Sequence, residues 1–550
     1  MHHGRLARMS YILIAIFAFS ANAKTFPAVP GEYVVKLKAA TNVMSERYIE
    51  ETLGVKLKEQ VNRNQGVILV QRSMVEERES ALRVLSSNSI VEYAEPNFIY
   101  RAVGGSTALP NDPELGKLWG LINNGQSTSG QGGKMAGKPD IDIDADKAWE
   151  IETGSKDVIV AVIDTGVRWN IPDLQNNIFT NQAELNGTAG VDDDNNGCVD
   201  DIHGCDVVGK DGDPMDVYGH GTHVAGTIGA SANNSEGIVG VAWNVTILPV
   251  RFLGDDGSGT LADAIKSIDY AVAMKAQVLN NSWGGGGFSQ TLMDAIVRAK
   301  DAGVLFLAAA GNSSNDNDGT PEFPASYDVD NIVSVAAVDP QGMVAEFSNW
   351  GKTRVHIAAP GVNILSHTMR GLESWSGTSM ACPHAAGVAA LLLSQDLSQN
   401  YLTIKNRMMA SAKPLASLRG RVASGMLNAN YALTNTVAPL DPNDPFNWQK
   451  TTDSISTVHP YPMGTRQEWT LTVPGAKKIA VYFSKFETEA GYDKVQFKNK
   501  DGVVVGTLSG RLGEIYGPAI EGDTVIISFA ADDTVNAYGF DVGGVAYTTN

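Results

Sequence analysis

Residues 158–166 read VIVAVIDTG, an unbroken apolar run that ends in Asp164 and a glycine turn. A short apolar run rich in β-branched residues is typical of a strand that is buried on both faces. Alternation of such strands with helices predicts a doubly wound α/β domain with a parallel sheet, and Asp164 then lies at the carboxyl edge, where these sheets carry their sites. Five further apolar runs alternate with helical patterns, at residues 246–252, 277–280, 304–310, 332–336 and 355–358.

The pattern changes on both sides of this domain, which we assign to residues 104–435. Residues 24–103 combine two helical stretches with short strands, which predicts a small independent α+β unit. Residues 436–445 hold three prolines and few apolar residues, so we expect a linker there. Residues 446–550 lack helical patterns, and Gly and Asp turns separate their strands, which indicates a β-sandwich. The strands are expected at residues 468–473, 478–483, 494–498, 503–506 and 524–529.

Residues 1–23 have the three parts of a secretory signal peptide. A basic start precedes an apolar stretch over residues 11–19, and Ala21 and Ala23 provide the small residues of a cleavage site. The alternative is a short membrane anchor, but the stretch is too short to span a bilayer comfortably. We see no other run long enough to be a membrane span, and therefore expect a secreted, extracellular protein.

The charge balance excludes one class of partner. The chain holds 42 Lys and Arg against 61 Asp and Glu, which gives a formal net charge of −19 at pH 7. Such an acidic surface repels the phosphates of nucleic acid, whereas it suits a secreted protein that holds divalent cations.

The three cysteines are too few for a disulfide scaffold. Cys198 and Cys205 are near enough in sequence to close one small loop, and we hypothesise that they are bridged. Cys382 lies in an apolar helical run, where a buried free thiol is expected.

Three segments hold the residue types that nucleophilic catalysis needs. Asp164 ends a buried strand, and residues 220–226 (HGTHVAG) place His220 at the start of a helix. In residues 377–384 (GTSMACPH), Ser379 opens a helix expected over 385–394, with Pro383 in its first turn. A hydroxyl nucleophile requires a base to take its proton and an acid to orient that base. The positive end of a helix dipole favours negative charge developing beside the serine. The chain order Asp, His, Ser is one of three known for this triad.

Together these segments resemble the subtilisin-like serine proteases, the subtilases of peptidase family S8, over about residues 115–435. Residues 308–312 (AAAGN) are similar to the family's oxyanion-hole segment, and residues 253–259 and 281–284 to the two segments that pair with an extended substrate. The resemblance implies a serine endopeptidase acting on proteins or peptides, with Asp164, His220, Ser379 and Asn312 in catalysis. It implies substrate contacts from Gly257, Ser258, Gly259, Ser282, Trp283, Gly284 and Gly311.

In the implied reaction Ser379 attacks the scissile carbonyl, His220 takes and returns the proton, and Asp164 orients His220. The Asn312 amide and the N–H of Ser379 hold the oxyanion. The alternatives are an inactive relative that keeps the fold, a non-catalytic surface binding protein, and an exported esterase, which would lack the extended substrate segments. Two further histidines, His223 and His384, do no chemistry in the family, and we expect them to pack in the core.

Specificity depends on Glu322, in residues 320–324 (TPEFP). The resemblance to the family places Glu322 near the base of the S1 pocket, where a carboxylate favours Lys or Arg at P1. The alternative is that Glu322 points to solvent or binds a cation, and the sequence leaves both open.

Residues 191–201 read VDDDNNGCVDD and predict a calcium site. Asp192, Asp194 and Asn196 alternate oxygen ligands before a glycine turn, although no Glu closes an EF-hand loop. The alternative is a solvated acidic loop. Resemblance to thermitase-like subtilases adds two calcium-binding segments, so we expect structural Ca²⁺, in an open number, as the cofactor. The additional candidate ligands are Asp206, Asp211, Asp213 and Asp216 in one segment, and Asp173 and Asn234 in the other.

The flanking regions also resemble known domains. Residues 24–103 are similar to the subtilase propeptide, which implies an intramolecular chaperone and inhibitor released by cleavage near Val103. Residues 446–550 resemble a bacterial CUB-like domain that would bind calcium at Glu489, Asp493 and Asp532, although the usual CUB cysteines are absent. A plain stabilising sandwich is the alternative. We expect a monomeric zymogen that processes itself.

Overall fold

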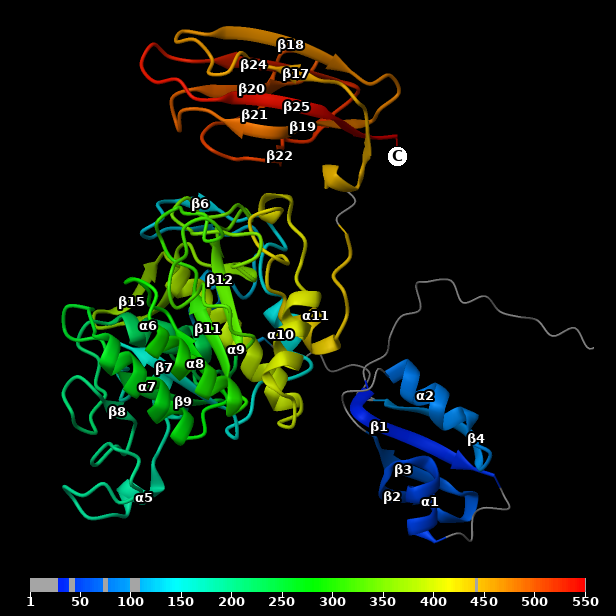
Figure 1. The fold of residues 1–550 in the computed structure, drawn as a ribbon, viewed down its shortest axis with the longest axis vertical. Helices are drawn as coiled ribbons and strands as arrows, with labels where there is room; N and C mark the ends of the chain where they lie inside the picture. The colour runs from blue at the N-terminus through cyan, green and yellow to red at the C-terminus, as the bar shows by residue number, and fades with distance from the viewer. Residues whose placement is uncertain (1–27, 39–44, 73–77, 99–108, 441–443, 550) are drawn as a thin grey trace, which may run out of the picture. The chain divides into compact units, whose positions relative to one another are not determined.

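The computed structural model describes residues 28–38, 45–72, 78–98, 109–440 and 444–549 (Figure 1). The expected signal peptide and the expected cleavage position near Val103 lie outside these residues. The chain forms two compact units, Met1–Gly105 and Ser106–Asn550. The first unit therefore ends close to the predicted end of the small α+β domain.

The N-terminal unit is a four-stranded antiparallel sheet with two helices, as the sequence predicts. The strand order is β2-β3-β1-β4. Helix α1 begins after Ser45, whose side chain accepts the N–H of Tyr48, and ends at Gly54 in the left-handed conformation. The elements are β1 (Ala28–Leu37), α1 (Glu46–Leu53), β2 (Lys56–Asn62), β3 (Val67–Gln71), α2 (Arg78–Ser87) and β4 (Val91–Phe98).

A seven-stranded parallel sheet organises the second unit, and all six strands predicted from apolar runs are present. The order is β13-β12-β11-β10-β7-β9-β8, so the chain adds strands first on one side of β7 and then on the other. Such a switch point is where doubly wound sheets carry ligands. The strands are β7 (Ile159–Asp164), β8 (Cys205–Asp206), β9 (Thr246–Arg251), β10 (Val278–Asn281), β11 (Leu305–Ala309), β12 (Ile332–Val338) and β13 (Ile357–Pro360).

Helices cover both faces of this sheet (Figure 1). Because successive strand residues point to opposite faces, Val160 and Val162 of β7 pack in one core with α6 (His220–Gly229) and α9 (Thr378–Gln395). Ala161 and Ile163 pack in the other core, with α7 (Leu261–Ala273) and α8 (Gln290–Asp301). These four side chains of β7 are fully buried, which explains the unbroken apolar run.

The remaining elements of this domain are short or peripheral. A hairpin of β14 and β15 follows the sheet directly, before α9 begins. Among the described residues, no helix is long and apolar enough to cross a membrane. The peripheral elements are β5 (Ser127–Thr128), β6 (Met135–Ala136), α3 (Ala145–Trp149), α4 (Pro172–Gln175), α5 (Gln182–Leu185), β14 (Ile364–Thr368), β15 (Gly371–Trp375), α10 (Tyr401–Ala410) and α11 (Ala429–Thr434).

The C-terminal domain is a β-sandwich of two antiparallel sheets. One follows the order β16-β25-β19-β22, with β17 and β23 attached, and the other β18-β24-β20-β21. Phe483, Phe497, Phe529 and Phe540 fill the core between them. The strands are β16 (Gln449–Lys450), β17 (Ile455–Ser456), β18 (Arg466–Thr472), β19 (Lys478–Glu487), β20 (Lys494–Lys498), β21 (Val504–Leu508), β22 (Ile515–Tyr516), β23 (Ile520–Glu521), β24 (Thr524–Ala530) and β25 (Gly539–Thr548).

Strand β25 is not among the predicted strands, although it pairs along the whole length of β19. Its centre holds Gly543 and Gly544, which interrupt the apolar alternation. A Cβ at Gly544 would meet the carbonyl oxygen of Thr451 at 2.5 Å, so the close approach of the neighbouring backbone requires glycine there.

Candidate active site

A carboxylate and a histidine meet at the carboxyl edge of the sheet. Asp164 is the last residue of β7 and His220 the first of α6. His220 Nδ1 lies 2.7 Å from Asp164 Oδ1, which also accepts the N–H of Thr165. Asp164 is fully buried, and its Oδ2 has no hydrogen-bond partner in the described part of the chain. The pair therefore fixes the imidazole with Nδ1 protonated and Nε2 free to act as a base.

Opposing influences act on the pKa of His220. Burial, the largest influence, lowers the pKa because it disfavours the charged imidazolium. The charge and hydrogen bond of Asp164, together with the charge of Asp216, raise the pKa, and the net direction is upward from the ordinary value of 6.5.

Ser379 lies in the first turn of α9, which begins at Thr378, seven residues earlier than the predicted 385. The prediction placed Pro383 in the first turn of the helix, but Pro383 lies inside the helix. A proline at this position lacks the N–H that would donate to the carbonyl oxygen of Ser379. Ser282 replaces that donor: its Oγ donates to Ser379 O at 2.9 Å. Ser379 Oγ in turn donates its proton to Ser282 O at 3.0 Å.

Asn312 follows β11, and its side chain is held by one neighbour. Its Oδ1 accepts both the N–H and the hydroxyl of Thr378, each at 2.9 Å. Because the amide oxygen is occupied, the two N–H groups of the amide are the free end of this side chain. Asn312, His220 and Ser379 all line one cavity of about 560 Å³, which we call the hairpin cavity because residues 368–376 form its far side. A donor, a base and a hydroxyl therefore face the same space.

The predicted substrate segments line a second cavity of about 620 Å³, which we call the strand cavity. His220 and Ser379 line both cavities, so the two spaces meet at these side chains. The structure thus brings the predicted segments 253–259 and 281–284 to a cavity that Ser379 also lines. The predicted residues lining the strand cavity are Gly257, Ser258, Gly259, Ser282, Trp283 and Gly284.

Glu322 lies between two of the predicted substrate residues. A Cβ added at Gly284 would meet Glu322 Oε1 at 3.1 Å, and one at Gly311 would meet Glu322 Cγ at 3.0 Å. Burial raises the pKa of Glu322, against a smaller lowering by the N–H of Gly285. The carboxylate is therefore partly withdrawn from water and lies beside Gly284. Glu322 and Gly311 are not among the residues that line the hairpin cavity or the strand cavity.

The other two histidines of these motifs pack in the core, as predicted. His223 is fully buried, its Nε2 lies 2.9 Å from Ile364 O, and its ring stacks on Trp375. His384 is also buried, with Nδ1 2.9 Å from Met380 O. Burial lowers the pKa of His223 to about 3 and that of His384 to about 4, so both are neutral.

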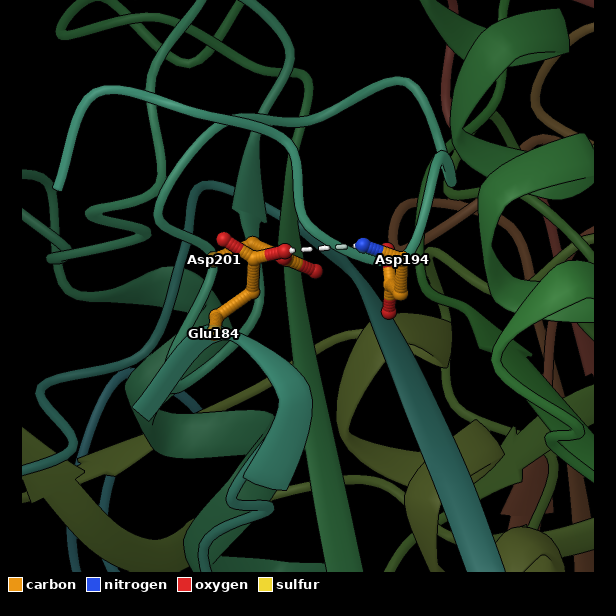
Figure 2. A group of neighbouring side chains, drawn as sticks. All are labelled: Glu184, Asp194 and Asp201. Atoms are coloured by element: carbon orange, nitrogen blue, oxygen red, sulfur yellow. Dashed lines mark hydrogen bonds between the residues drawn. The ribbon is translucent and has the colours of Figure 1, made fainter. Parts of the chain in front are cut away.

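The acidic loop (residues 181–216) gathers a different set of carboxylates from the predicted one. Ligand atoms of Glu184, Asp194 and Asp201 lie within 4.8 Å of one another (Figure 2). Burial, followed by the charge of Asp194, raises the pKa of Asp201 to about 6. Close carboxylates repel one another unless a proton or a cation separates them. The sequence prediction missed Glu184, in the short helix α5, and Asp201, which stands within the quoted acidic run.

Asp192 and Asn196, which were predicted as ligands, have other partners. The two oxygens of Asp192 accept the N–H groups of Asn196 and Gly197, so Asp192 closes the turn that precedes the disulfide. Asn196 lies next to the group, since its amide donates to Asp201 Oδ2 at 2.9 Å.

In the second predicted calcium segment, Asp206, Asp211, Asp213 and Asp216 have different partners within the protein. Asp206 forms an ion pair with Arg251, and Asp213 accepts the indole N–H of Trp169. Asp211 Oδ1 accepts the N–H of Asp213, within the same turn. Asp216 caps α6: its oxygens accept the N–H groups of Tyr218, Gly219 and Thr222 and the Thr222 hydroxyl. All four carboxylates thus have protein donors, and Asp216 orients the helix that begins with His220.

The third predicted pair, Asp173 and Asn234, is in contact. The Asn234 amide donates to Asp173 Oδ1 at 2.7 Å, and His367 Nε2 lies 2.7 Å from Asp173 Oδ2. Asp112, which was not predicted, lies beside this pair, and its buried Oδ1 has no partner among the described residues. Burial, reinforced by the charge of Asp173, raises the pKa of Asp112. A cation beside these carboxylates would satisfy the orphaned oxygen.

The predicted set of the C-terminal domain is brought together. Ligand atoms of Glu489, Asp493 and Asp532 lie within 4.8 Å of one another. Asp493 is fully buried, accepts the N–H of Asp532 and is hydrogen-bonded to the Tyr461 hydroxyl. Glu489 Oε2 is a buried oxygen without a partner in the described residues, which again suits a cation.

The disulfide hypothesis is confirmed. Cys198 and Cys205 are bridged, which ties the middle of the acidic loop to the start of β8. Cys382 is a buried free cysteine, as predicted, and burial raises its pKa to about 12, so the thiol stays protonated.

Comparison with known proteins agrees with this geometry. The profile of the subtilase family matches residues 155–437, and that of the CUB domain matches residues 446–543. The "Thermophilic serine proteinase" of Bacillus sp. (strain AK1) is 35% identical over 407 residues, which cover 74% of this chain and 88% of that protein.

Two further similarities are more limited. "Subtilisin-like protease 1" of Plasmodium berghei (strain Anka) is 34% identical over 298 residues, 51% of this chain and 50% of that protein. A solved structure of a protease from Pseudoalteromonas arctica PAMC 21717 is 29% identical, with a TM-score of 0.47, covering 59% of this chain and 98% of that one. The family profile spans more than half of the chain, and the Bacillus relative is matched over most of its length. The chain therefore belongs to the subtilase family and is a subtilisin-like serine endopeptidase, with a CUB domain after the catalytic domain.

Proposed function

We propose that Asp164, His220, Ser379 and Asn312 hydrolyse peptide bonds in proteins through an acyl-enzyme. One observation carries this proposal: the 2.7 Å contact of Asp164 with His220, at the meeting point of two cavities that Ser379 also lines. Asp164 holds the tautomer in which Nε2 of His220 is a base.

The reaction begins when a bound substrate displaces the Ser379 hydroxyl from Ser282 O toward His220 Nε2. In free proteases such hydrogen bonds are often loose and tighten only with substrate. Ser379 Oγ then attacks the scissile carbonyl while His220 takes the proton, and the Asn312 amide and the N–H of Ser379 hold the oxyanion. Collapse breaks the C–N bond, and His220 returns the proton to the leaving amine. Water then attacks the acyl-enzyme by the same route and releases Ser379.

Glu322 favours Lys or Arg at P1, the residue whose carbonyl is attacked. Its position between Gly284 and Gly311 supports this choice over a solvent-exposed orientation. A cationic side chain would pair with a partly desolvated carboxylate. Glu322→Ala should abolish the preference in a P1 substrate series, and an unchanged P1 profile would refute it.

Calcium is the proposed structural cofactor. Two clusters of three carboxylates supply the hard oxygen ligands that Ca²⁺ takes. One cluster is Glu184, Asp194 and Asp201 in the acidic loop, and the other is Glu489, Asp493 and Asp532 in the CUB domain. Asp112, Asp173 and Asn234 form the third candidate, because of the orphaned oxygen of Asp112. Bound calcium would neutralise carboxylates that otherwise repel one another.

The chain is proposed to be made as a secreted zymogen and to act as a monomer. Residues 1–23 would direct export, and residues 24–103 would assist folding and inhibit the enzyme until cleavage near Val103. The separate compact core of the N-terminal unit supports a removable domain.

Intact mass of the full chain and of Ser379→Ala, both folded with calcium, tests this function. The wild type should lose the residues up to about 103, whereas Ser379→Ala should remain full length. A wild type that stays intact and hydrolyses no peptide would favour a non-catalytic binding protein.

A further inference from the structure

A small cavity of about 80 Å³ lies beside the amine of Lys405. None of the residues that line it lines the hairpin cavity or the strand cavity, and the peptidase mechanism uses none of them. Lys405 belongs to α10, and His356, which directly precedes β13, shares the cavity wall with it. The cavity is therefore a separate place where a small molecule can meet an amine.

The contacts of the His356 ring fix its tautomer. The backbone N–H of Ser334 donates to His356 Nδ1 at 3.0 Å. Because a backbone N–H only donates, Nδ1 carries no proton. Burial is the largest of the influences that lower the pKa of His356 to about 3, so the ring is neutral. Its single proton is therefore on Nε2, which lies 3.2 Å from Lys405 Nζ.

This proton faces a nitrogen that is already a donor on its other sides. Lys405 Nζ donates to Asp330 O at 3.1 Å and to Ile332 O at 2.7 Å. An ammonium has three hydrogens and no acceptor, so its third hydrogen would face the hydrogen on His356 Nε2. An uncharged amine has two hydrogens for the two carbonyl oxygens and a lone pair that accepts the hydrogen from Nε2. The contacts therefore favour the uncharged amine.

The surroundings act on the charge of Lys405 in both directions. Burial, the largest influence, lowers the pKa of Lys405 because it disfavours the ammonium. The charges of Asp330 and Asp328 raise the pKa, and the net direction is downward. The titratable and charged residues that line the cavity with Lys405 are Tyr327, Asp328, Asp330, Arg354 and His356.

We propose that Lys405 is an uncharged, nucleophilic amine at neutral pH and a site where small aldehydes bind covalently as an iminium. Its lone pair attacks the aldehyde carbon while the π electrons of the C=O bond move to oxygen. One proton moves from nitrogen to that oxygen and a second comes from solvent, water leaves, and a C=N bond joins Nζ to the aldehyde carbon. The iminium is a cation, which Asp328 and Asp330 favour, whereas an anionic product such as a carbamate would be repelled by them.

The test is reductive methylation of the full chain with formaldehyde and sodium cyanoborohydride at pH 7 and at pH 9. All samples carry Ser379→Ala, so the result is independent of self-cleavage and of the proposed function. Peptide mapping by mass spectrometry gives the initial rate at each lysine, and Lys352, which is exposed on the same domain, is the reference.

The reference lysine should respond to pH far more steeply than Lys405. An ordinary lysine, with a pKa of about 10.4, holds roughly 1 part amine in 10³ at pH 7, so its amine fraction rises about 100-fold by pH 9. The amine fraction of Lys405 has little left to gain. The rate at Lys405 divided by the rate at Lys352 should therefore fall at least about tenfold from pH 7 to pH 9.

His356→Gln removes the ring hydrogen that faces Nζ and offers an amide oxygen as an acceptor. Lys405 should then become an ammonium, and the ratio should stay within about twofold between the two pH values. Ser424→Ala is the matched control: its hydroxyl donates to the backbone oxygen of His356 and not to the ring, so it should keep the wild-type fall.

A ratio that does not change with pH when His356 is intact would overturn the proposal, and this result needs no variant of the cavity and does not depend on how well His356→Gln folds. Absence of any label on Lys405 at both pH values would overturn it too, because the amine would then be closed to an aldehyde. A fall in His356→Gln equal to that with His356 intact would contradict the role given to the ring hydrogen.

Discussion

The catalytic edge of the sheet and the acidic loop both depend on carboxylates, but they place them differently. Asp164 ends a strand of the central sheet, and His220 and Ser379 lie in the first turns of helices α6 and α9, so regular backbone fixes each side chain. In the acidic loop, Asp192 and Asp216 accept turn and helix N–H groups that need an acceptor. A motif at the end of a regular element therefore predicts position, whereas spacing within a loop does not predict which carboxylates meet.

The largest effect is expected from a substitution at the catalytic edge of the sheet. Asp164→Asn keeps the shape of the side chain but favours the wrong tautomer of His220. We expect kcat to fall about 10⁴-fold, with the thermal midpoint little changed. Steady-state kinetics on a peptide p-nitroanilide measures this, and a loss of less than tenfold would show that the Asp164 contact is structural.

Asn312→Leu tests the donor at the same edge. Loss of the amide should lower kcat about 10²–10³-fold with KM nearly unchanged, a range known from subtilisin itself. Thr378→Ala should give a smaller loss, because the amide oxygen keeps the backbone N–H of Thr378. If KM rises while kcat is unchanged, Asn312 binds the ground state and does not stabilise the oxyanion.

The acidic loop offers a comparison of two aspartates in the same segment. Asp201→Asn should bind one calcium ion fewer than the wild type in isothermal titration, whereas Asp192→Asn should bind the same number. At calcium concentrations 100-fold above Kd, the lost site should cost about 2.7 kcal/mol of stability. If the two variants bind the same number of calcium ions, Asp201 and Asp192 do not differ as ligands. That result would contradict a site made by Glu184, Asp194 and Asp201 without Asp192.

The smallest expected effect is that of Asp216, in the acidic loop, on the pKa of His220 at the catalytic edge. Because the pKa of His220 is raised above 6.5 and the base must be neutral, kcat/KM should rise with pH and reach half its maximum above about pH 6.5. Asp216→Asn removes a negative charge that raises this pKa, so the midpoint should move to lower pH. Asp213→Asn is the control and should leave the midpoint in place. A midpoint that does not respond to Asp216→Asn would mean that Asp216 only caps α6.

The strands of the parallel sheet were predictable because burial on both faces leaves unbroken apolar runs. The three catalytic motifs were predictable from their residue types, their chain order and their resemblance to a known family. Strand β25 was not, since Gly543 and Gly544 interrupt its alternation where another backbone approaches closely. The start of α9 was placed too late because Pro383 is a helix breaker by propensity. Ser282, distant in sequence, supplies the donor that Pro383 lacks, and no local pattern reveals such a contact.

The candidate metal ligands were also predicted only in part. Glu489, Asp493 and Asp532 were predicted through resemblance and are brought together. Glu184, Asp201 and Asp112 were missed, because their grouping depends on long-range packing of turns.

The central claim is that Ser379 is a nucleophile activated by His220. The most direct test is treatment of the folded chain with phenylmethylsulfonyl fluoride, followed by peptide mapping by mass spectrometry. We predict a single sulfonyl adduct on the peptide that contains Ser379, absent in Ser379→Ala and strongly reduced in His220→Ala. An unlabelled wild type, or a label on another serine, would contradict the account.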